Sequence, residues 1–248
     1  MRILLAIPVY NEERYVTKVL DEVRHYTSDI LVIDDGSSDQ TPMLLAQQPV
    51  DVIRHATNRG YGQSMIDAFR WSSCYRYDWV ITMDCDEQHE PASLPMFFKA
   101  IEQDDADIIS GSRYMSDSAT EDLPPADRRK INQIITEQIN GTLDLKLTDG
   151  FCGFKAYRVS AMRKLRLSES GYAFPLQFWV QAVANDLVIR EVPISLIYND
   201  PNRSFGGPLN DAEKRLAHYR QVFAKELKEF PDRFACACVC SCNGQSEG

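Results

Sequence analysis

The sequence predicts an α/β protein built on a mostly parallel sheet with helices on both of its faces. Two observations carry this prediction. Short aliphatic runs, typical of strands buried on both faces, alternate with segments whose apolar residues recur at helical spacing. Several of these runs end in Asp or Asn, residues that commonly begin loops. Strict alternation of strand and helix is typical of a doubly wound parallel sheet.

The first half of the chain supplies five expected strands and the helices between them. The strands are expected at residues 2–10, 30–33, 50–54, 79–83 and 108–109. Residues 11–13 (Asn-Glu-Glu) provide a cap and first-turn acids for a helix, whose apolar residues follow at helical spacing up to Val23. Another helix begins at Asp39, and a third follows residues 60–62.

A change of character near residue 116 separates the second half from the first. Leu123-Pro124-Pro125 interrupts regular structure, and a helix with an isoleucine-rich side is expected after it. The expected elements are helices at 127–140, 176–184 and 210–229, a segment at 151–157 and a strand at 188–197. Because we find no internal repeat and no low-complexity linker, we expect one compact domain over residues 1–230.

Composition places the chain among ordinary globular proteins. It has 248 residues, of which 44% are apolar and 25% charged, and this length suffices to bury a sizeable core. The sequence lacks an apolar run of about 18 residues, so a membrane-spanning helix is not expected. The formal net charge of -9 argues against a nucleic-acid partner, because polyanions bind to positive surfaces.

The cysteines and the N-terminus bear on the cellular compartment. Seven cysteines, an odd number, do not suggest a disulfide framework, and the apolar run that ends at Asn11 is too short for a signal peptide. We therefore expect a reducing, cytoplasmic location. Residues 231–248 are expected to form a flexible tail, with a soft-metal site or acylation left open for its cysteines. These are Cys236, Cys238, Cys240 and Cys242.

Acidic residues follow three of the expected strands at one edge of the sheet. They are Glu12, Asp34, Asp35, Asp84 and Asp86. A single acid at such a position is ordinarily a loop or cap residue. Ligands of open α/β sheets bind beyond the carboxyl ends of the strands, so acids after three strands at this edge indicate a site. Two carboxylates spaced i, i+2 suit a Mg²⁺ ion that also binds a phosphate, with Gln88 as a neutral third ligand.

Five motifs give the chain a resemblance to a known family. They read Ile7-Pro-Val-Tyr-Asn-Glu-Glu13, Asp34-Asp-Gly-Ser-Ser-Asp39, Asn58-Arg-Gly-Tyr-Gly62, Asp84-Cys-Asp-Glu-Gln-His89 and Ser110-Gly-Ser-Arg113. A lone Asp-x-Asp would be weak evidence, but the ordered and spaced set resembles the family 2 glycosyltransferases of GT-A fold. The branch that it resembles most is that of the dolichol-phosphate mannosyltransferases.

The resemblance implies roles for individual residues. The implied nucleotide-binding residues are Pro8, Tyr10, Asn11, Glu12, Asp34, Asp35, Gly60, Gly62 and Asp84. Asp35 would read the base or the ribose. The residues that would hold Mg²⁺ or Mn²⁺ on the diphosphate are Asp84, Asp86 and Gln88, and those implied in catalysis are Asp86, Arg113, Asp149 and Arg203. Residues 1–116 would be the nucleotide-sugar and metal half, and residues 117–230 the acceptor half.

Basic residues in the second half bear on the acceptor. Arg128, Arg129 and Lys130 open the helix expected at 127–140, and Arg203 lies in a loop between Pro201 and Pro208. Their charged groups would capture an acceptor phosphate, and the alternative for the triplet is a solvated basic face.

The chain departs from the family's pattern at two places. Pro201-Asn202-Arg203-Ser204 stands where relatives commonly have Gly-Glu-Ser-Lys, so Arg203 would replace the charge of the loop lysine. Gln177 stands where the family has an acid, and a carboxamide cannot act as a general base. An acceptor that is already anionic needs no such base, so Gln177 favours a phosphate acceptor.

The expected function is metal-dependent, inverting transfer of a sugar, mannose from GDP-mannose, to a polyprenyl or dolichyl phosphate. A UDP-sugar donor with another acceptor is the alternative within the family. A non-catalytic nucleotide-binding module is a further alternative, kept open by Gln177. A nucleotidyltransferase is disfavoured, because residues 8–11 do not form the Gly-rich phosphate loop that such enzymes usually need.

A lipid-phosphate acceptor would be met at a membrane surface. The net charge of -9 opposes adsorption to anionic lipid unless basic residues cluster locally. We therefore expect peripheral association at the cytoplasmic membrane face through residues 128–130, the cysteine tail or a membrane-anchored partner subunit. A homo-oligomer is also left open.

Overall fold

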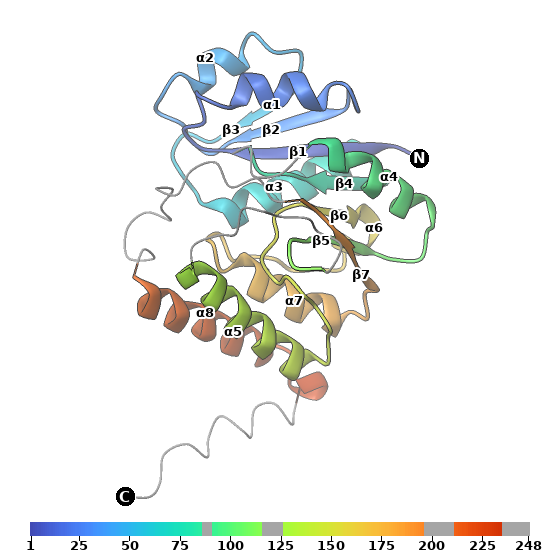
Figure 1. Cartoon of the computed structure of the whole chain (residues 1–248), viewed down its shortest axis with the longest axis vertical. Helices are drawn as coiled ribbons and strands as arrows, with labels where there is room; N and C mark the ends of the chain where they lie inside the picture. Colours follow the sequence, from blue (N-terminus) through green and yellow to red (C-terminus); the bar gives the residue numbers. More distant parts are fainter. Residues whose placement is uncertain (86–90, 116–125, 196–210, 235–248) are drawn as a thin grey trace, which may run out of the picture.

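In the computed structural model, described at residues 1–85, 91–115, 126–195 and 211–234, one sheet forms the centre of the molecule (Figure 1). The described strands lie in the order β3-β2-β1-β4-β6-β5-β7. They are β1 (Ile3–Val9), β2 (Ile30–Asp34), β3 (Asp51–Arg54), β4 (Trp79–Thr82), β5 (Ile108–Ser112), β6 (Lys155–Arg158) and β7 (Ile189–Pro193).

Helices cover both faces of this sheet. They are α1 (Val16–Val23), α2 (Thr41–Leu45), α3 (Tyr61–Cys74), α4 (Leu94–Glu102), α5 (Ala126–Leu143), α6 (Val159–Met162), α7 (Phe174–Ala184) and α8 (Ala212–Leu227), with a short 3₁₀ turn at Pro91–Ser93. The single α/β domain and its mostly parallel sheet confirm the predicted fold class. Within the described ranges, none of the helices combines the length and the apolar character needed to cross a bilayer.

The apolar residues of β1 explain why helices are needed on both sides. Leu4 and Ala6 belong to a buried cluster with α3, α5, α6, α7 and α8, whereas Leu5 and Ile7 belong to a second cluster with α1, α2 and α4. Side chains alternate between the faces of a strand, so a continuous aliphatic run buries apolar area on both. Each such Leu or Ile side chain contributes about 1.5–3 kcal/mol when it is fully buried.

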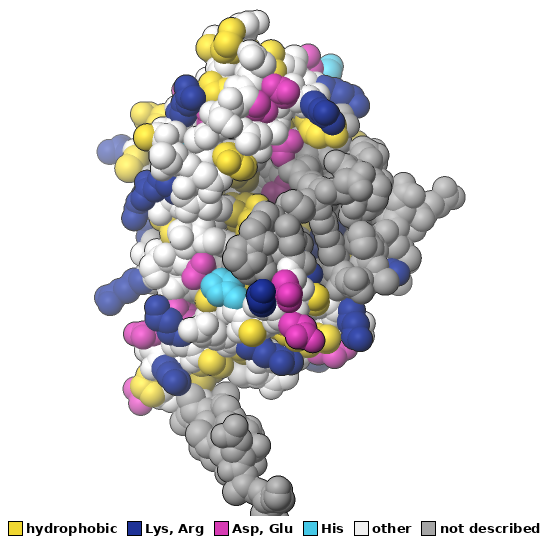
Figure 2. Space-filling view, turned by 90° about the vertical axis from the view of Figure 1, so that its left-hand side faces the viewer, with side chains coloured by type: hydrophobic (Ala, Val, Ile, Leu, Met, Phe, Trp, Pro, Cys, Tyr) yellow, Lys and Arg dark blue, Asp and Glu magenta, His cyan; other side chains and the backbone are white. Residues whose placement is uncertain are grey.

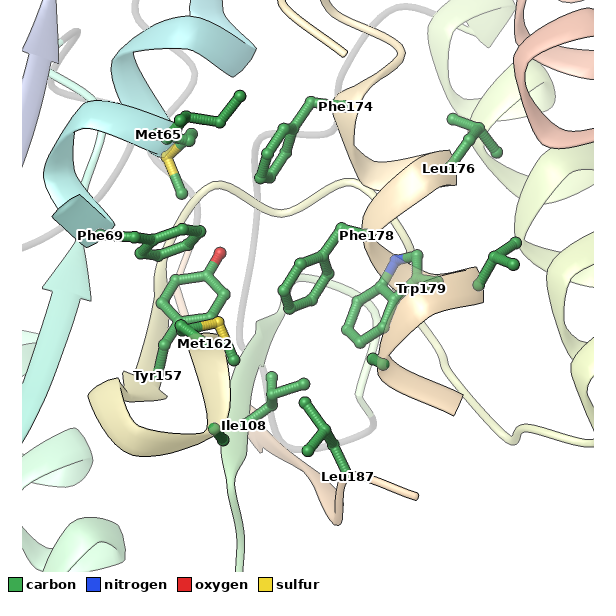
Figure 3. Packing of buried hydrophobic residues seen from close by; sticks show 14 of the residues in the cluster. Met65, Phe69, Ile108, Tyr157, Met162, Phe174, Leu176, Phe178, Trp179 and Leu187 are labelled. Atoms are coloured by element: carbon green, nitrogen blue, oxygen red, sulfur yellow. The ribbon is translucent and has the colours of Figure 1, made fainter. Parts of the chain in front are cut away.

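Aromatic side chains join α3 to α7 across one face of the sheet (Figure 3). The Phe69 ring lies 4.9 Å from that of Tyr157 on β6, and Tyr157 lies 5.4 Å from Phe178, both in edge contacts. Phe174 stacks on Phe178 at 5.9 Å. Edge and offset contacts of this kind add about 0.5–1.5 kcal/mol each beyond the burial of area. The donor half and the acceptor half expected from the sequence therefore share one core.

β6 runs against its neighbours, which strict alternation of strand and helix did not predict. It pairs antiparallel with both β4 and β5, while the other pairs in the sheet are parallel. The reason lies in the connection from α5. Residues 149–154 lie along the edge at which the parallel strands end, because Asp149 bonds Arg113 and Gly153 contacts Asp84. A strand that starts from this edge must run in the opposite direction.

Two local interpretations of the sequence need correction. α1 starts at Val16 with no acid in its first turn and no side-chain cap from Tyr15, and residue 12 contributes its backbone carbonyl, which accepts the N–H of Val16 at 2.9 Å. Asn11 instead adopts a positive φ of 57°, and the N–H of Glu12 donates to Thr41 Oγ1 at 2.9 Å. These residues thus tie the end of β1 to the start of α2. α4 and α6 were not predicted from the sequence.

Candidate active site

The parallel strands end at one edge of the sheet, and the predicted site residues that the structure describes gather there. This edge faces the viewer in Figure 2, where acidic and basic side chains are interspersed over the described part of the surface. Tyr10, directly after β1, is 47% exposed, whereas Glu12 is buried. Asn11 Oδ1 accepts the N–H of Ser38, and its own N–H donates to Ser37 Oγ. The first two acidic motifs are thereby joined.

Asp34 closes β2 with a completely buried carboxylate. Its Oδ1 accepts the N–H of Ser37 at 2.8 Å, which shapes the turn after the strand. Its Oδ2 has the Arg54 Nε at 3.3 Å, but no aligned hydrogen bond among the described residues. Because a buried carboxylate oxygen is costly to leave without a donor, this oxygen is available to a donor group at the strand-end edge.

Asp35 holds the neighbouring loop that contains Gly60. Its Oδ1 accepts the N–H of Arg59 at 2.7 Å and its Oδ2 accepts the N–H of Gly60 at 2.8 Å. The Nδ1 of His55 lies 2.6 Å from Oδ1, and the Nε2 of the same ring lies 3.1 Å from Asp67 on α3. The carboxylate is thus engaged by three protein donors. A direct contact between Asp35 and a base or ribose stays a prediction.

Replacing Asp35 by Asn is expected to lower the free energy of unfolding by about 1–3 kcal/mol, because the new amide group faces a backbone N–H and leaves it without an acceptor. Urea denaturation would measure this. Asp51→Asn, at an exposed position on β3, is the control and is expected to change stability by no more than about 0.5 kcal/mol. Equal unfolding of the two variants would contradict the loop-holding role of Asp35.

Gly60 and Gly62 meet backbone from the other side. Gly60 has a positive φ of 97°, and a Cβ added there would lie 2.4 Å from the carbonyl oxygen of Ser170. A Cβ at Gly62 would lie 2.1 Å from the carbonyl oxygen of Glu169. Both positions therefore need glycine because backbone of the chain itself approaches them closely, and the nucleotide contact that the resemblance implies stays a prediction.

Asp84 follows β4 and lies directly against Gly153. A Cβ at Gly153 would lie 2.4 Å from Asp84 Oδ2 and 2.7 Å from Oδ1, so the absence of a side chain there makes room for the carboxylate. Asp86 and Gln88 lie outside the described residues. Within the described ranges, no three His, Cys, Asp or Glu side chains form a metal-binding group. Asp84 thus lies in a small space that a methyl group on residue 153 would fill. A carboxylate placed in this way is suited to a hard cation that also binds a phosphate.

Arg113 and Asp149 form a buried ion pair at the end of β5. Arg113 donates through Nε to Oδ2 at 2.6 Å and through Nη2 to Oδ1 at 2.9 Å, which is the bidentate geometry of a strong pair. Burial by itself would raise the pKa of Asp149, but the charge and hydrogen bonds of Arg113 outweigh it and lower the pKa to about 2. Asp149 is therefore ionised at neutral pH and holds Arg113 in place.

Other groups fix Asp149 from two sides. Asn132 of α5 donates its side-chain N–H to Oδ1 at 3.2 Å. Glu191 of β7 accepts the N–H groups of Thr148 and Asp149 at 2.8 and 3.1 Å. These contacts connect the ion pair to the helix whose first turn carries the predicted acceptor residues.

Lys155 is a buried cation within the segment expected at 151–157, where it was not singled out as a site residue. It is 4% exposed, its ammonium donates to the carbonyl oxygen of Cys152, and it lies 5.5 Å from the centre of the Trp179 ring. Burial lowers the pKa of Lys155, whereas the charges of Asp149 and Asp84 act in the opposite direction. Beside it lies a cavity of about 10 Å³, room for about one water molecule. A lysine inside an apolar segment was the signal for this cation.

Tyr61 is a further site residue that the sequence analysis did not single out. It starts α3 between Gly60 and Gly62, and its ring stacks on that of Tyr172 at 6.3 Å. Burial and the nearby charge of Asp84 raise the pKa of the Tyr61 hydroxyl. Tyr61 thus connects the loop held by Asp35 with the acid at the end of β4.

The predicted acceptor residues are only partly described. Arg129 and Lys130 lie in the first turns of α5, but the Arg128 side chain and Arg203 lie outside what the structure describes. Lys130 is exposed, whereas the buried Nε of Arg129 has no hydrogen-bond partner among the described residues. Burial raises the pKa of Tyr114, and the charges of Arg113 and Arg129 oppose this. Arg129 therefore lies on the Arg113 side of the site.

Asp84, the segment held by Asp35 and the Arg113–Asp149 pair thus lie at the carboxyl ends of the strands, the edge at which α/β proteins with open sheets bind their ligands. The comparisons with known proteins define the class of protein. The family model "Glycosyl transferase family 2" matches residues 5–166. The undecaprenyl-phosphate mannosyltransferase of Micrococcus luteus is 32% identical over 224 residues, which is 86% of this chain and 91% of that protein.

Two further proteins extend the comparison. A UDP-N-acetylglucosamine–dolichyl-phosphate N-acetylglucosaminyltransferase of Methanococcus voltae is 27% identical over 82% of this chain and 89% of its own. The crystal structure of glucosyl-3-phosphoglycerate synthase from Mycobacterium tuberculosis, with Mn²⁺, UDP and glucosyl-3-phosphoglycerate, superposes with a TM-score of 0.68. That likeness covers 92% of this chain and 80% of the other at 16% identity, and it shows the fold.

The chain belongs to glycosyl transferase family 2, has the GT-A fold and is a glycosyltransferase. Its relatives also confirm the branch that the motifs predicted, because several of them are mannosyltransferases of polyprenyl or dolichyl phosphates.

Proposed function

We propose that this chain transfers mannose from GDP-mannose to a polyprenyl phosphate, with inversion at the anomeric carbon and with the help of Mg²⁺ or Mn²⁺. The observation that carries the proposal is the arrangement of residues 149–155 at the strand-end edge. This segment contacts Asp84 through Gly153 and fixes the Arg113 guanidinium through Asp149. The same segment thus holds the Asp84 carboxylate, which would bind the metal, and the Arg113 guanidinium, which would bind a phosphate.

The donor side requires neutralisation of a diphosphate leaving group. Asp84, Asp86 and Gln88 would hold the divalent cation, which supplies positive charge to the departing diphosphate when it is bound. Arg113 adds a fixed positive charge whose geometry is set before substrate arrives, because Asp149 holds it through two hydrogen bonds. The C–O bond from the anomeric carbon to the diphosphate breaks as the acceptor oxygen forms its bond on the opposite face.

The acceptor side supports a phosphate in preference to a hydroxyl. A hydroxyl acceptor needs a base within reach, and two acids described at this end of the site are committed to other contacts. Asp149 is ion-paired with a pKa of about 2, and Glu191 accepts backbone N–H groups. A phosphate monoester carries its own anionic oxygen and needs no deprotonation at neutral pH. Arg129, and Arg128, Lys130 and Arg203 as predicted from the sequence, would bind it.

The donor has one competing assignment. The Micrococcus luteus relative is named for mannose transfer, whereas the Methanococcus voltae relative is named for a UDP-linked amino sugar. A UDP-sugar therefore remains the second candidate, and both candidates share a polyprenyl-phosphate type of acceptor. Such an acceptor places the enzyme at a membrane surface, and we propose peripheral association with the cytoplasmic face, alone or through a membrane-anchored subunit.

Nucleotide binding tests the proposal. Calorimetry of the full chain with Mn²⁺ is expected to give tighter binding of GDP and GDP-mannose than of UDP and UDP-glucose. Asp86→Ala is expected to remove the metal-dependent part of this affinity. Transfer is then measured from GDP-mannose to a short polyprenyl phosphate and to a polyprenol that lacks the phosphate.

Each outcome decides one part of the proposal. A preference for uridine nucleotides would replace mannose by the second candidate. Unchanged affinity in the Asp86→Ala variant would contradict the metal site. Transfer to the alcohol but not to the phosphate would exclude the proposed acceptor.

A further inference from the structure

Gln177, which stands where the family has an acid, is the centre of a buried hydrogen-bond network. Its Oε1 accepts the N–H groups of Ser168 and Glu169, both at 2.7 Å. Its Nε2 donates to Glu226 Oε2 at 2.8 Å and to Ser168 Oγ at 3.2 Å. The side chain thus uses both ends of its carboxamide, one toward the backbone of residues 168–169 and one toward a carboxylate of α8.

Glu226 supplies the negative charge that position 177 lacks. It is 6% exposed, and its second oxygen accepts the Nε2 of Gln181 at 2.6 Å. Gln181, one turn after Gln177 on α7, also binds both backbone groups of Arg166, accepting its N–H at 2.6 Å and donating to its carbonyl at 3.0 Å. Two glutamines of α7 and one glutamate of α8 therefore hold the backbone of residues 166–169.

The held segment lies directly against Gly60, at the end of the loop, and Gly62, in the first turn of α3. The Ser170 carbonyl accepts the N–H of Gln63 at 3.1 Å, and the Glu169 carbonyl lies where a side chain at Gly62 would be. No side chain separates the two backbones at these glycines, so a shift of one must move the other. On its opposite side the same loop is held by Asp35 through the N–H groups of Arg59 and Gly60.

We propose that Gln177, Gln181 and Glu226 are positioning residues that set the donor-nucleotide affinity by fixing residues 59–63, the end of the loop and the first turn of α3, through the backbone of residues 166–170. The proposal rests on the function proposed above, since it assigns this loop to the donor pocket. It also makes α8, the helix that follows residues 196–210, part of the support of that pocket. Gln177 thus acts through its hydrogen bond to the charged Glu226, and it does not take the place of a general base.

The residues at positions 177 and 226 can be exchanged, which tests the effect of the charge on each residue separately from the effect of side-chain size. In Gln177→Glu, a carboxylate still accepts the two N–H groups but faces Glu226 across the former 2.8 Å hydrogen bond, so two buried like charges meet. Adding Glu226→Gln restores a donor between the two positions and leaves an oxygen to accept from Gln181. The double variant keeps the net charge and nearly every hydrogen bond of the original.

Two measurements on the full chain test the proposal. Amide hydrogen exchange of residues 58–64 reports on the loop without any ligand, and calorimetry with Mn²⁺ and the preferred nucleotide reports on the donor pocket. For Gln177→Glu we expect at least tenfold faster exchange in this segment and at least tenfold weaker nucleotide binding. For the double variant we expect both quantities within about twofold of the original, a non-additivity typical of residues in contact.

The control is Gln133→Glu, in which the same substitution removes a 2.9 Å hydrogen bond to Glu137 on the exposed side of α5. It is expected to leave loop exchange and nucleotide affinity unchanged. Glu226→Gln alone is the milder variant, in which one donor meets another, and an intermediate effect is expected. It keeps the test valid if Gln177→Glu does not fold.

The outcomes separate this inference from the proposed function. Unchanged exchange at residues 58–64 in both single variants would overturn the positioning role, whatever the nucleotide result. Failure of the double variant to recover would also overturn it. If the original chain bound no nucleotide, the proposed function would fail, while hydrogen exchange would still decide whether the network holds the loop.

Discussion

Asp149→Asn is expected to lower the free energy of unfolding by about 3–5 kcal/mol, because it leaves the Arg113 guanidinium buried without its counter-charge. Asp149 is fully buried and accepts hydrogen bonds from Arg113, Asn132 and the N–H of Phe151. The variant should also lose transfer activity, since Arg113 is no longer held toward a phosphate. Urea denaturation at neutral pH and a transfer assay measure the two effects.

The double variant Arg113→Met, Asp149→Leu distinguishes stability from function. Replacing both members of a buried pair by apolar residues of similar size is often neutral for stability, so most of the loss in Asp149→Asn should be regained. Activity should stay absent, because the guanidinium is gone. Recovery of activity together with stability would contradict the role given to Arg113.

The same pair predicts a dependence of stability on pH. The folded-state pKa of Asp149 is about 2, below the ordinary value of 3.8 expected in the unfolded chain. Folding therefore favours the ionised form, and the contribution is fully present well above the unfolded pKa. It is lost as the pH falls from about 4 to about 2. The difference in unfolding free energy between the original chain and Asp149→Asn should shrink over this interval.

Gly153→Ala has the second large expected effect, a loss of metal-dependent nucleotide affinity of at least about a hundredfold, equivalent to roughly 2.7 kcal/mol. The new methyl group would lie 2.4 Å from Asp84 Oδ2, so the carboxylate must leave its position. Calorimetry with and without Mn²⁺ measures the change. Gly153→Ala should resemble Asp84→Ala in the metal-dependent part and should leave the metal-independent part largely intact.

Gly141→Ala provides the matched control for this substitution. Gly141 lies in α5, and a Cβ there meets no atom within 4 Å. Alanine is preferred over glycine in a helix by about 0.5–1 kcal/mol, so this variant should be slightly more stable and should bind nucleotide as before. Nucleotide binding by Gly153→Ala at the original affinity would mean that Asp84 does not need the space beside Gly153.

The sequence predicted the sheet and the acids at its edge because these depend on local pattern. Aliphatic runs marked the strands, and the rule that ligands bind beyond the strand ends placed Asp34, Asp35 and Asp84 together. The direction of β6 was not predictable in this way, because it depends on where the chain from α5 re-enters the sheet. Residues 11–13 were misread as a cap, since their partners Ser37 and Thr41 lie after the next strand.

Partners that are far apart in the sequence account for most of what the sequence analysis missed. Gln177 read alone suggested a lost base, but its meaning depends on Glu226, 49 positions away. The resemblance implied Asp149 in catalysis, but its hydrogen bonds to Arg113, 36 positions away, were not predictable from its place in the motif. Periodicity and motif spacing contain no information about such pairs, because each is created only when distant elements pack together.

The place of β5 in the sheet has a consequence for the order of events during synthesis. β1, β2, β3 and β4 neighbour one another and can pair as soon as residue 82 has been made, but β5 lies between β6 and β7, which come later in the chain. β5 therefore stays without a strand partner until residues 155–158 emerge. A chain synthesised only as far as β5 therefore lacks the strand that pairs with the β4 edge. Insertion of β6 closes that edge, and residues 149–154, which lead into β6, form the Arg113–Asp149 and Asp84–Gly153 contacts, so these contacts of the candidate site depend on the strand that joins β4 to β5.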